Sequence, residues 1–453
     1  MKKLLTLGMA ALMSVTTACI FAGCGGSDPN LVEEGATEVV VYFQDFEAWE
    51  NEQRKKMIDK FNSNLNDGIQ LVARFFQDEA YTDVLASARE NGTAPDIFMC
   101  SYGNLYGTVV AGDYAAPLNG LVKQEYLDDI KDNVKSMVTF GDNIYAFPQL
   151  TEASAMLFYR KDYFAKAGVT EAPKSWEDLL NVCQKVKGQL GKGQYTLGLP
   201  ILAGLGWATY GLQYNAAGSV ALSDDWTQCL VDNDGYRALA GLWYDLYKGG
   251  YVPAGSMTAR GYNDIIEALC MDKLAMTFAG SWSIGTIMDS YPDMKDLIGV
   301  APLPTLSGKS GEVTASNGGW TFCISSTSKN KELAAKVIEW FFAEDTARAA
   351  DYFEVASYSK SPTLKSVQAY IDTHVPAELK DWLDVVSSVT SIAIPEPTYS
   401  WEISTAVSGM LENCALNTNV PKGTLIDQQI KLCVEKIQRI MAQQGRNPAY
   451  PAS

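Results

Sequence analysis

Short apolar runs alternate along this chain with longer amphipathic segments. The runs at 38–43, 69–73 and 97–99 are rich in β-branched and aromatic residues, which predicts buried parallel strands. The segments between them place apolar residues such as Met57 and Phe61 at helical spacing. Strands that alternate with helices predict an α/β fold built on a parallel sheet.

The same alternation continues to the C-terminus. Further strands are predicted at 144–147, 154–159, 274–278, 298–301 and 320–324, and further helices at 234–247, 263–271 and 330–342. Ser175 and Asp178 have the spacing of a helix capping box. A last helix carries the apolar stripe Ile426, Ile430, Cys433, Ile437 and Ile440. Trp243 and Trp340 lie on apolar helix faces, so we assign them to the core.

The N-terminus has the features of an export signal. Two lysines precede an apolar stretch that ends at Ala22, and small residues then surround Cys24. This pattern resembles a bacterial lipobox, which predicts a signal peptide over 1–23 and lipidation of Cys24; Cys19 is a second candidate. A single membrane-spanning anchor is the alternative interpretation of the apolar stretch. The Gly- and Ser-containing segment 24–36 predicts a flexible tether.

The charge balance excludes some classes of partner. Without residues 1–23 the chain keeps 34 basic and 53 acidic residues, a net charge of −19. Such acidity argues against nucleic acid and against binding to anionic lipid headgroups. About 415 residues follow the tether, enough for two or three domains, and every later apolar run is interrupted by charges.

Few residues are candidates for catalysis or metal binding. The seven cysteines beyond Cys24 include no Cys-x-x-Cys pair, which favours buried free thiols over disulfides. His374 is the only histidine, so we expect no metal site and no cofactor. A Gly-x-Ser-x-Gly elbow and a phosphate-binding loop are both absent from the sequence, so nucleotide hydrolysis would belong to a partner. Paired carboxylates of a glycosidase stay possible among 53 acidic residues.

Aromatic residues at junctions of loops and strands indicate a different kind of site. A sugar ring offers an apolar face for stacking and a rim of hydroxyls for hydrogen bonds to carboxylates and amides. Several tryptophans and tyrosines lie beside glycine, serine or turn residues, where a ring is displayed rather than packed. They are Tyr102 after Ser101, Trp207, Trp282 after Ser281, Trp320, Tyr399 and Trp401.

Eight segments in one order carry a resemblance to a known family. They are Val39–Tyr42 with Lys60–Phe61, Ala94–Phe98, Asn143–Pro148, Leu157–Phe164, Pro173–Leu179, Leu274–Met276 with Gly280–Trp282, Val300–Pro304, and Ser328–Ala334. In this order, behind a lipobox, the chain resembles the bacterial extracellular solute-binding proteins of family 1, a maltose-binding-protein-like group.

The resemblance implies a two-lobed, periplasmic-binding-protein-like α/β fold with a ligand cleft between the lobes. Three crossings of the chain are expected near 148–152, 302–305 and 365–368. The N-terminal lobe would then contain 37–148 plus 304–366, and the C-terminal lobe 150–302 plus 367–450.

The resemblance also assigns roles to particular residues. It implies that Glu152 is a hinge-side carboxylate that contacts sugar and that Trp282 and Trp401 stack on sugar. It places Ser101 and Tyr102 in a loop at the rim of the cleft.

Three further polar residues are candidates for the site, and two segments differ from the family pattern. Gln44, Asp45 and Glu47 follow the first strand, at the carboxyl end where parallel sheets tend to bind ligands. The sequence departs from the family pattern at 158–160, and also over 352–362, which leaves open what Tyr352, Glu354 and Tyr358 contribute.

These inferences predict a monomeric, non-enzymatic, lipid-anchored receptor on the extracytoplasmic face of the membrane. It would capture a carbohydrate, most readily an oligosaccharide, and dock on the permease subunits of an ABC importer with a separate ATPase. Two alternatives stay open. One is the same receptor fold with a polyamine, iron chelate or glycerophosphodiester as ligand, and the other is a surface glycoside hydrolase.

Overall fold

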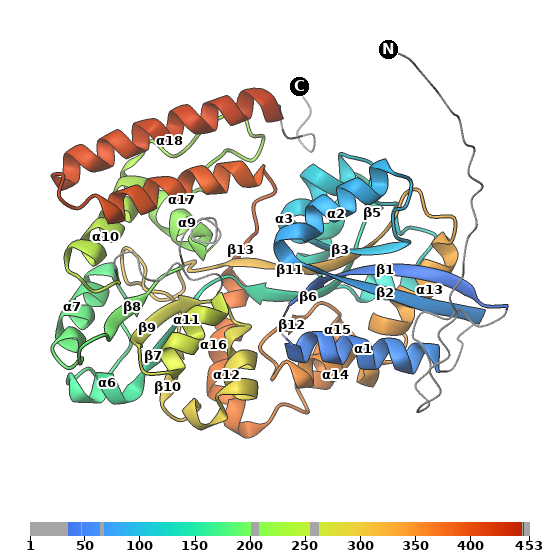
Figure 1. Cartoon of the computed structure of the whole chain (residues 1–453), viewed down its shortest axis with the longest axis horizontal. Helices are drawn as coiled ribbons and strands as arrows, with labels where there is room; N and C mark the ends of the chain where they lie inside the picture. The colour runs from blue at the N-terminus through green and yellow to red at the C-terminus, as the bar shows by residue number, and fades with distance from the viewer. Residues whose placement is uncertain are drawn as a thin grey trace, which may run out of the picture.

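The computed structural model describes residues 35–46, 48–63, 68–200, 208–253, 262–445 and 447. Two lobes lie side by side, and strands β6 (Phe147–Ala153) and β11 (Ser316–Ile324) run between them (Figure 1). Each lobe has its own sheet and its own buried apolar core. The predicted two-lobed α/β fold is therefore confirmed.

The first lobe is built on a mixed sheet with the strand order β12-β6-β11-β3-β1-β2. Its other strands are β1 (Thr37–Asp45), β2 (Ile69–Gln77), β3 (Ile97–Ser101) and β12 (Ser361–Pro362), with a separate hairpin of β4 (Thr139–Phe140) and β5 (Asn143–Ile144). Its helices are α1 (Ala48–Asn62), α2 (Asp78–Glu90), α3 (Tyr102–Asn104) with the π-helix η2 (Leu105–Val110), α4 (Gln124–Asp129), α5 (Asp132–Val138), α13 (Lys331–Phe342), α14 (Thr346–Val355), α15 (Lys365–Ile371) and the 3₁₀-helix η4 (Ala377–Leu379).

The first two predicted strands pair in parallel along their whole length, from Thr37 with Ile69 to Asp45 with Gln77. The predicted parallel sheet is in fact mixed, because β11 runs antiparallel to both β3 and β6. Strand β11 arrives from the second lobe, so its direction opposes that of the strands that begin in the first.

The second lobe has a four-stranded sheet with the order β10-β7-β9-β8, in which only β8 and β9 are parallel. The strands are β7 (Met156–Arg160), β8 (Tyr195–Gly198), β9 (Leu274–Ala279) and β10 (Ile298–Ala301). The helices are α6 (Lys161–Lys166), α7 (Trp176–Lys187), α9 (Tyr210–Ala217), α10 (Asp234–Lys248), α11 (Tyr262–Cys270), α12 (Ser283–Ser290), the 3₁₀-helix η3 (Pro292–Met294), α16 (Lys380–Ile392), α17 (Trp401–Leu416) and α18 (Lys422–Gln444), with β13 (Ile394–Pro395) pairing with the start of β11.

Several local predictions are confirmed. Ser175 accepts a hydrogen bond from the backbone N–H of Asp178, whose side chain accepts one from the backbone N–H of Ser175, so the capping box forms. Trp243 and Trp340 are buried. The seven cysteines within the described residues are free thiols, and all but the half-buried Cys229 are buried. Among those residues, no helix has the length and apolarity needed to cross a bilayer.

The second and third crossings lie later in the chain than we expected. Residues 305 and 306 hydrogen-bond to Lys174 and Asn215 of the second lobe, and the apolar core changes only between Ala315 and Phe322. Helix α15 and Leu379 pack in the first core, and α16 packs in the second. The core against which each apolar face packs determines the lobe to which the segment belongs. The resemblance alone did not locate these two crossings.

Strand β6 contains a β-bulge where it pairs with β11. Leu150 lies opposite Trp320 and Pro148 lies opposite Thr321, so Gln149 is the extra residue. On the facing strand Gly319 has φ +134°, and a Cβ there would come within 2.4 Å of the Leu150 carbonyl oxygen. A bulge redirects the side chain that it adds. Here it redirects Gln149, on a strand that both lobes share.

The approach of α9 to the start of β11 generates a prediction about stability. A Cβ on Gly211 would lie 2.2 Å from the backbone nitrogen of Ala315, whereas one on Gly409, in α17, would meet nothing within 4 Å. We expect Gly211→Ala to lower the free energy of unfolding by about 1–3 kcal/mol through overpacking. Gly409→Ala should raise it by about 0.5–1 kcal/mol through helix propensity. Urea denaturation followed by tryptophan fluorescence measures both changes, and equal effects of the two variants would contradict the packing.

Candidate functional site

The two lobes are in contact, and two of the contacts lie at glycines. At one, a Cβ on Gly285 in α12 would lie 3.2 Å from the carbonyl oxygen of Ala356 and 3.5 Å from the ring of Trp49. At the other, a Cβ on Gly107 would lie 3.2 Å from the carbonyl oxygen of Thr398. Since α12 belongs to the second lobe and Trp49 to the first, the structure shows the lobes in contact.

Buried polar atoms occur at the first of these contacts and on the chain beside it: Ser359 Oγ would lie 3.4 Å from a Cβ on Gly285, and three further hydroxyls belong to residues within four positions of Gly285. Trp49 Nε1 and Ser359 Oγ from the first lobe have no hydrogen-bond partner among the described residues, nor do Ser281 Oγ, Ser283 Oγ and Thr286 Oγ1 from the second. A buried polar group without a partner costs about 1–3 kcal/mol. Several such atoms from both lobes at one junction indicate a place for a polar ligand. We call these five residues, together with Glu152 and Lys360, the interlobe site.

A cluster of buried charges supports the first-lobe side of this site. The carboxylate of Glu50 accepts hydrogen bonds from Arg54 Nη2 at 2.5 Å, Tyr352 OH at 2.7 Å and Lys360 Nζ at 2.9 Å. Lys360 Nζ also lies 3.9 Å from Oε2 of Glu152, on the shared strand β6. All five side chains are buried, so the cluster fixes the ammonium group of Lys360 next to the interlobe site.

The pKa of Glu50 reflects these contacts. Burial alone would raise the pKa of this carboxyl, but the positive charges of Arg54 and Lys360, together with hydrogen bonds from Lys360 and Tyr352, lower it to about 2. Glu50 is therefore a carboxylate at neutral pH, which excludes it as the proton donor of a glycosidase.

Aromatic rings surround the same ammonium group. Lys360 Nζ lies 5.5 Å from the ring centre of Trp49 and 5.9 Å from those of Phe46 and Tyr352, within the range of cation–π attraction. The Phe46 ring in turn lies 4.7 Å from that of Trp320. The first lobe thus presents half-buried rings beside its polar atoms, a combination that suits a polyhydroxylated ring.

The structure places some of the predicted site residues at this junction. Glu152 and Ser281 belong to the interlobe site, and Ser281 donates its backbone N–H to the carbonyl of Ala153. Trp282 is the N-cap residue of α12, and its ring lies against Gly280, where a Cβ would come within 1.7 Å of it. The ring of Trp320 contacts that of Phe46.

Other predicted residues have structural contacts. The Gln44 carbonyl accepts a hydrogen bond from Arg54, and Asp45 accepts one from the side chain of Asn51, so both order the turn into α1. Ser101 caps α3 by accepting from the backbone N–H of Asn104. Tyr102 is buried, and its hydroxyl donates to the carbonyl of Leu150.

The remaining predicted residues lie on the second lobe or outside the described part. Tyr399 packs edge-on against Tyr210 in the second core, 6.4 Å between ring centres. Trp401 begins α17 and is 44% exposed. Glu47, Trp207 and Cys24 lie outside the residues that the structure describes.

Sequence reasoning missed the residues that organise the site, namely Phe46, Trp49, Glu50, Arg54 and Lys360. Glu50 and Arg54 have helical i,i+4 spacing, which is a signal for an ion pair. Most such pairs are exposed, however, and nothing in the local sequence shows that this one is buried against a lysine 310 positions away. Of the residues in the departing segment 352–362, Tyr352 joins the charge cluster, while the hydroxyl of Tyr358 donates to the carbonyl of His374.

The charge cluster generates a prediction about acid stability. Glu50→Gln would leave Arg54 and Lys360 buried without their shared carboxylate, which should cost about 3–5 kcal/mol of unfolding free energy at pH 7. An unfolded glutamate has a pKa of about 4.3, whereas that of folded Glu50 is about 2. The stabilisation from this carboxylate is therefore complete above about pH 5 and is lost as the pH falls towards 2.

Urea denaturation between pH 7 and pH 2 checks this prediction. Glu50→Gln should reduce the loss of stability over the acid range relative to wild type. The matched control is Glu52→Gln on the same helix, which removes an exposed ion pair with Lys56 and should leave stability unchanged. An acid dependence of Glu50→Gln identical to that of wild type would contradict the assigned role.

Comparison with known proteins places this geometry in a family. The family model described as bacterial extracellular solute-binding protein matches residues 47–348. A binding protein of Brucella abortus (strain 2308) is 28% identical over 234 residues, 51% of this chain and 54% of that protein. This chain therefore spans about half the length of that relative. The galactooligosaccharide-binding protein of Bacillus subtilis (strain 168) is 25% identical over 352 residues, 74% of this chain and 75% of that protein.

Solved structures show the same fold. A solute-binding protein of an ABC transporter from Thermotoga lettingae TMO, bound to α-D-tagatose, superposes with a TM-score of 0.74 at 22% identity, covering 89% of this chain and 100% of that one. Maltose-bound MalE3 of T. maritima gives a TM-score of 0.73 at 21% identity, covering 89% and 99%. Two lobes that meet over unsatisfied polar atoms agree with a protein that holds a solute between them. The chain belongs to the bacterial extracellular solute-binding proteins.

Proposed function

We propose that this protein is the lipid-anchored, extracytoplasmic receptor of an ABC importer and that it binds a carbohydrate, most readily an oligosaccharide, at the interlobe site. The observation that carries the proposal is the set of buried hydroxyl and indole N–H groups without partners at the contact between the lobes. Sugar hydroxyls both donate and accept hydrogen bonds, so one sugar can satisfy several of these atoms at once.

The rings beside those atoms support the same ligand class. Trp49, Phe46 and Trp320 offer aromatic faces on the first lobe, and Trp282 lies at the start of α12 on the second. The names of relatives point the same way, since they include a galactooligosaccharide-binding protein and a multiple sugar-binding protein of Streptococcus mutans.

Capture follows from the division of the site between the lobes. A solute that contacts atoms of both lobes stabilises the closed arrangement, because those contacts exist together only when the lobes meet. The closed receptor would then be recognised by the permease subunits, and the separate ATPase would supply the energy for transport. The receptor itself carries out no bond cleavage.

The first test is a thermal-shift and calorimetric screen over mono- and oligosaccharides, with polyamines, an iron chelate and a glycerophosphodiester in parallel. We expect a saccharide to bind with saturation and to be recovered unchanged by chromatography. Saturable binding of one of the other solutes instead would show that the ligand is not a carbohydrate. Cleavage of the saccharide would show that the protein is a glycoside hydrolase.

Substitution of tryptophan distinguishes stacking from packing. Trp282→Ala and Trp401→Ala should each weaken binding of the best saccharide about ten-fold, since a stacked ring contributes about 1–2 kcal/mol. The control is Trp382→Ala in the second core, which should cost about 3–5 kcal/mol of unfolding free energy and leave the affinity of the folded fraction unchanged. Unchanged affinity in a destabilised Trp282 or Trp401 variant would assign that ring to the core.

Lipid anchoring is tested at the N-terminus. Replacement of the proposed lipidated residue, Cys24→Ala, should move the protein from the membrane fraction to the soluble fraction, because the acyl chains would be lost. Fractionation followed by immunoblotting measures the change. Continued membrane association of this variant, together with release of Cys19→Ala, would instead place the lipid on Cys19.

A further inference from the structure

The first lobe contains a pocket that is distinct from the interlobe site. It encloses about 600 Å³ of space, part of it open to solvent. Its walls come from β1, α1, β6, β11, α13, α14 and α15 and from the β12 turn, all in the first lobe. The residues that matter most here are Phe43, Gln149, Phe322, Phe341, Ala349 and Phe353.

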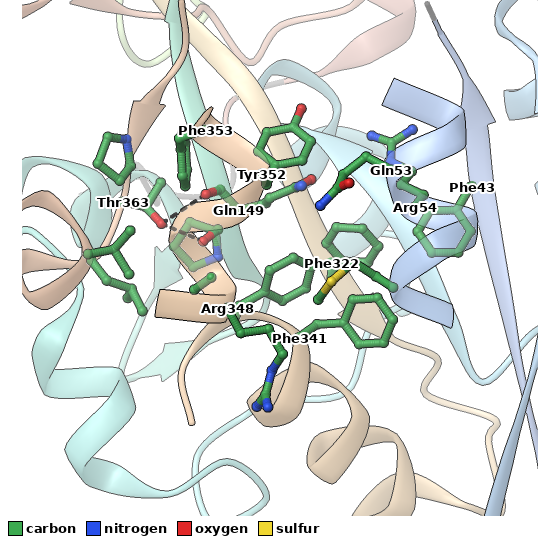
Figure 2. A pocket seen from close by; sticks show the side chains of 17 residues that line it. Phe43, Gln53, Arg54, Gln149, Phe322, Phe341, Arg348, Tyr352, Phe353 and Thr363 are labelled. Carbon is green, nitrogen blue, oxygen red and sulfur yellow. Dashed lines mark hydrogen bonds between the residues drawn. The ribbon is translucent and has the colours of Figure 1, made fainter. Parts of the chain in front are cut away.

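Six of the seventeen lining residues are aromatic. Figure 2 shows the rings of Phe322 and Phe341 on one side of the pocket, with Phe353 and Tyr352 along another. Rings that line a space favour an aromatic occupant, because offset and edge-to-face contacts between rings add to the gain from apolar burial.

Two polar side chains in this lining have an atom without a hydrogen-bond partner among the described residues, Arg54 at Nε and Gln149 at Oε1. Gln149 is 8% exposed. Gln149 is the extra residue of the β-bulge in β6, so the bulge gives this side chain a direction that regular pairing would not. Thr363 holds the bulged backbone by donating to the carbonyl oxygens of Pro148, at 2.6 Å, and Gln149, at 3.3 Å.

The amide of Gln149 also defines the chemistry of the occupant. An amide oxygen accepts a hydrogen bond and an amide nitrogen donates one, and a hydroxyl can serve either atom. A single aromatic ring that bears one hydroxyl therefore fits both the rings and the amide.

We propose that this pocket is a second binding site, for small phenols, and that Gln149 hydrogen-bonds the phenolic hydroxyl. The proposal is independent of the proposed sugar site, because none of its residues belongs to the interlobe site. Two residues nevertheless connect the pocket to the charge cluster beside that site. Arg54 and Tyr352 line the pocket and also donate hydrogen bonds to the carboxylate of Glu50.

Phenol and benzene are the probes, since they differ by the hydroxyl alone. Titration of the methyl-labelled full chain without sugar should show saturable, one-to-one binding of phenol, with contacts between its protons and the methyl groups of Leu364 and Val367. Benzene should bind about ten-fold more weakly, the typical contribution of one hydrogen bond. In Gln149→Leu the two ligands should bind with equal affinity.

A matched pair of variants on α14 tests the location. Ala349 is buried in the pocket wall and Ala347 is exposed on the same helix. Ala349→Met should fill the space and weaken phenol binding about ten-fold or more, while Ala347→Met should leave it unchanged. Unfolding curves show whether both variants are folded. If Ala349→Met does not fold, the contacts between phenol and the methyl groups of the wild-type protein still locate the ligand.

Three results would each overturn the proposal. They are no saturable binding of phenol, which would mean that the pocket holds water only; equal affinities for phenol and benzene in the wild-type protein; and phenol contacts to methyl groups outside the pocket. Each can occur whether or not a saccharide binds between the lobes, so failure here is distinguishable from failure of the proposed function.

Discussion

The carboxylate of Glu50 is fully buried, and the first lobe is organised around the need to neutralise it. Arg54 reaches it from one turn along the same helix, Tyr352 from 302 positions away and Lys360 from 310. Because a buried charge that loses a partner is costly, these three groups have little freedom to move apart. The carboxylate thus ties α1 to α14 and to the β12 turn, and it fixes the ammonium group of Lys360 where the lobes meet.

The shared strands extend this constraint to the second lobe. Glu152 on β6 lies near Lys360 and opposite Gly318 on β11, and Ala153, the next residue, already packs in the second lobe. The bulge a few residues earlier on the same strand places Gln149 in the pocket of the first lobe. One short strand therefore contacts the charge cluster, the interlobe site and the pocket. A shift of this strand at any one of the three is connected to the other two through the same backbone.

Local patterns in the sequence predicted much of the fold. The strands around Val39, Leu71 and Phe98, the capping box at Ser175 and the buried face of Trp243 each depend on neighbours within a few residues. The candidate site was harder to predict, since its geometry depends on contacts between distant segments. Asp45 and Tyr102 occupy suitable positions after strands, yet their side chains are used by Asn51 and by the carbonyl of Leu150. Glu50 looks in the sequence like an ordinary helix-surface acid, and only the tertiary fold brings Lys360 to it.

The contact at Gly285 has a consequence for the efficiency of transport. Gly285 itself has no side chain to order when it meets the Ala356 carbonyl, so the second-lobe side of this contact adds little entropic cost. Closure without a ligand is therefore not prevented at this contact. In the proposed importer, a closed but empty receptor that docked on the permease would lead the ATPase to hydrolyse ATP without transport of a solute. The hydroxyls of Ser281, Ser283 and Ser359 would oppose such closures, because a buried hydroxyl without a hydrogen-bond partner costs about 1–3 kcal/mol unless a solute supplies one. The same hydroxyls that would bind the solute would in this way also limit ATP hydrolysis when no solute is bound.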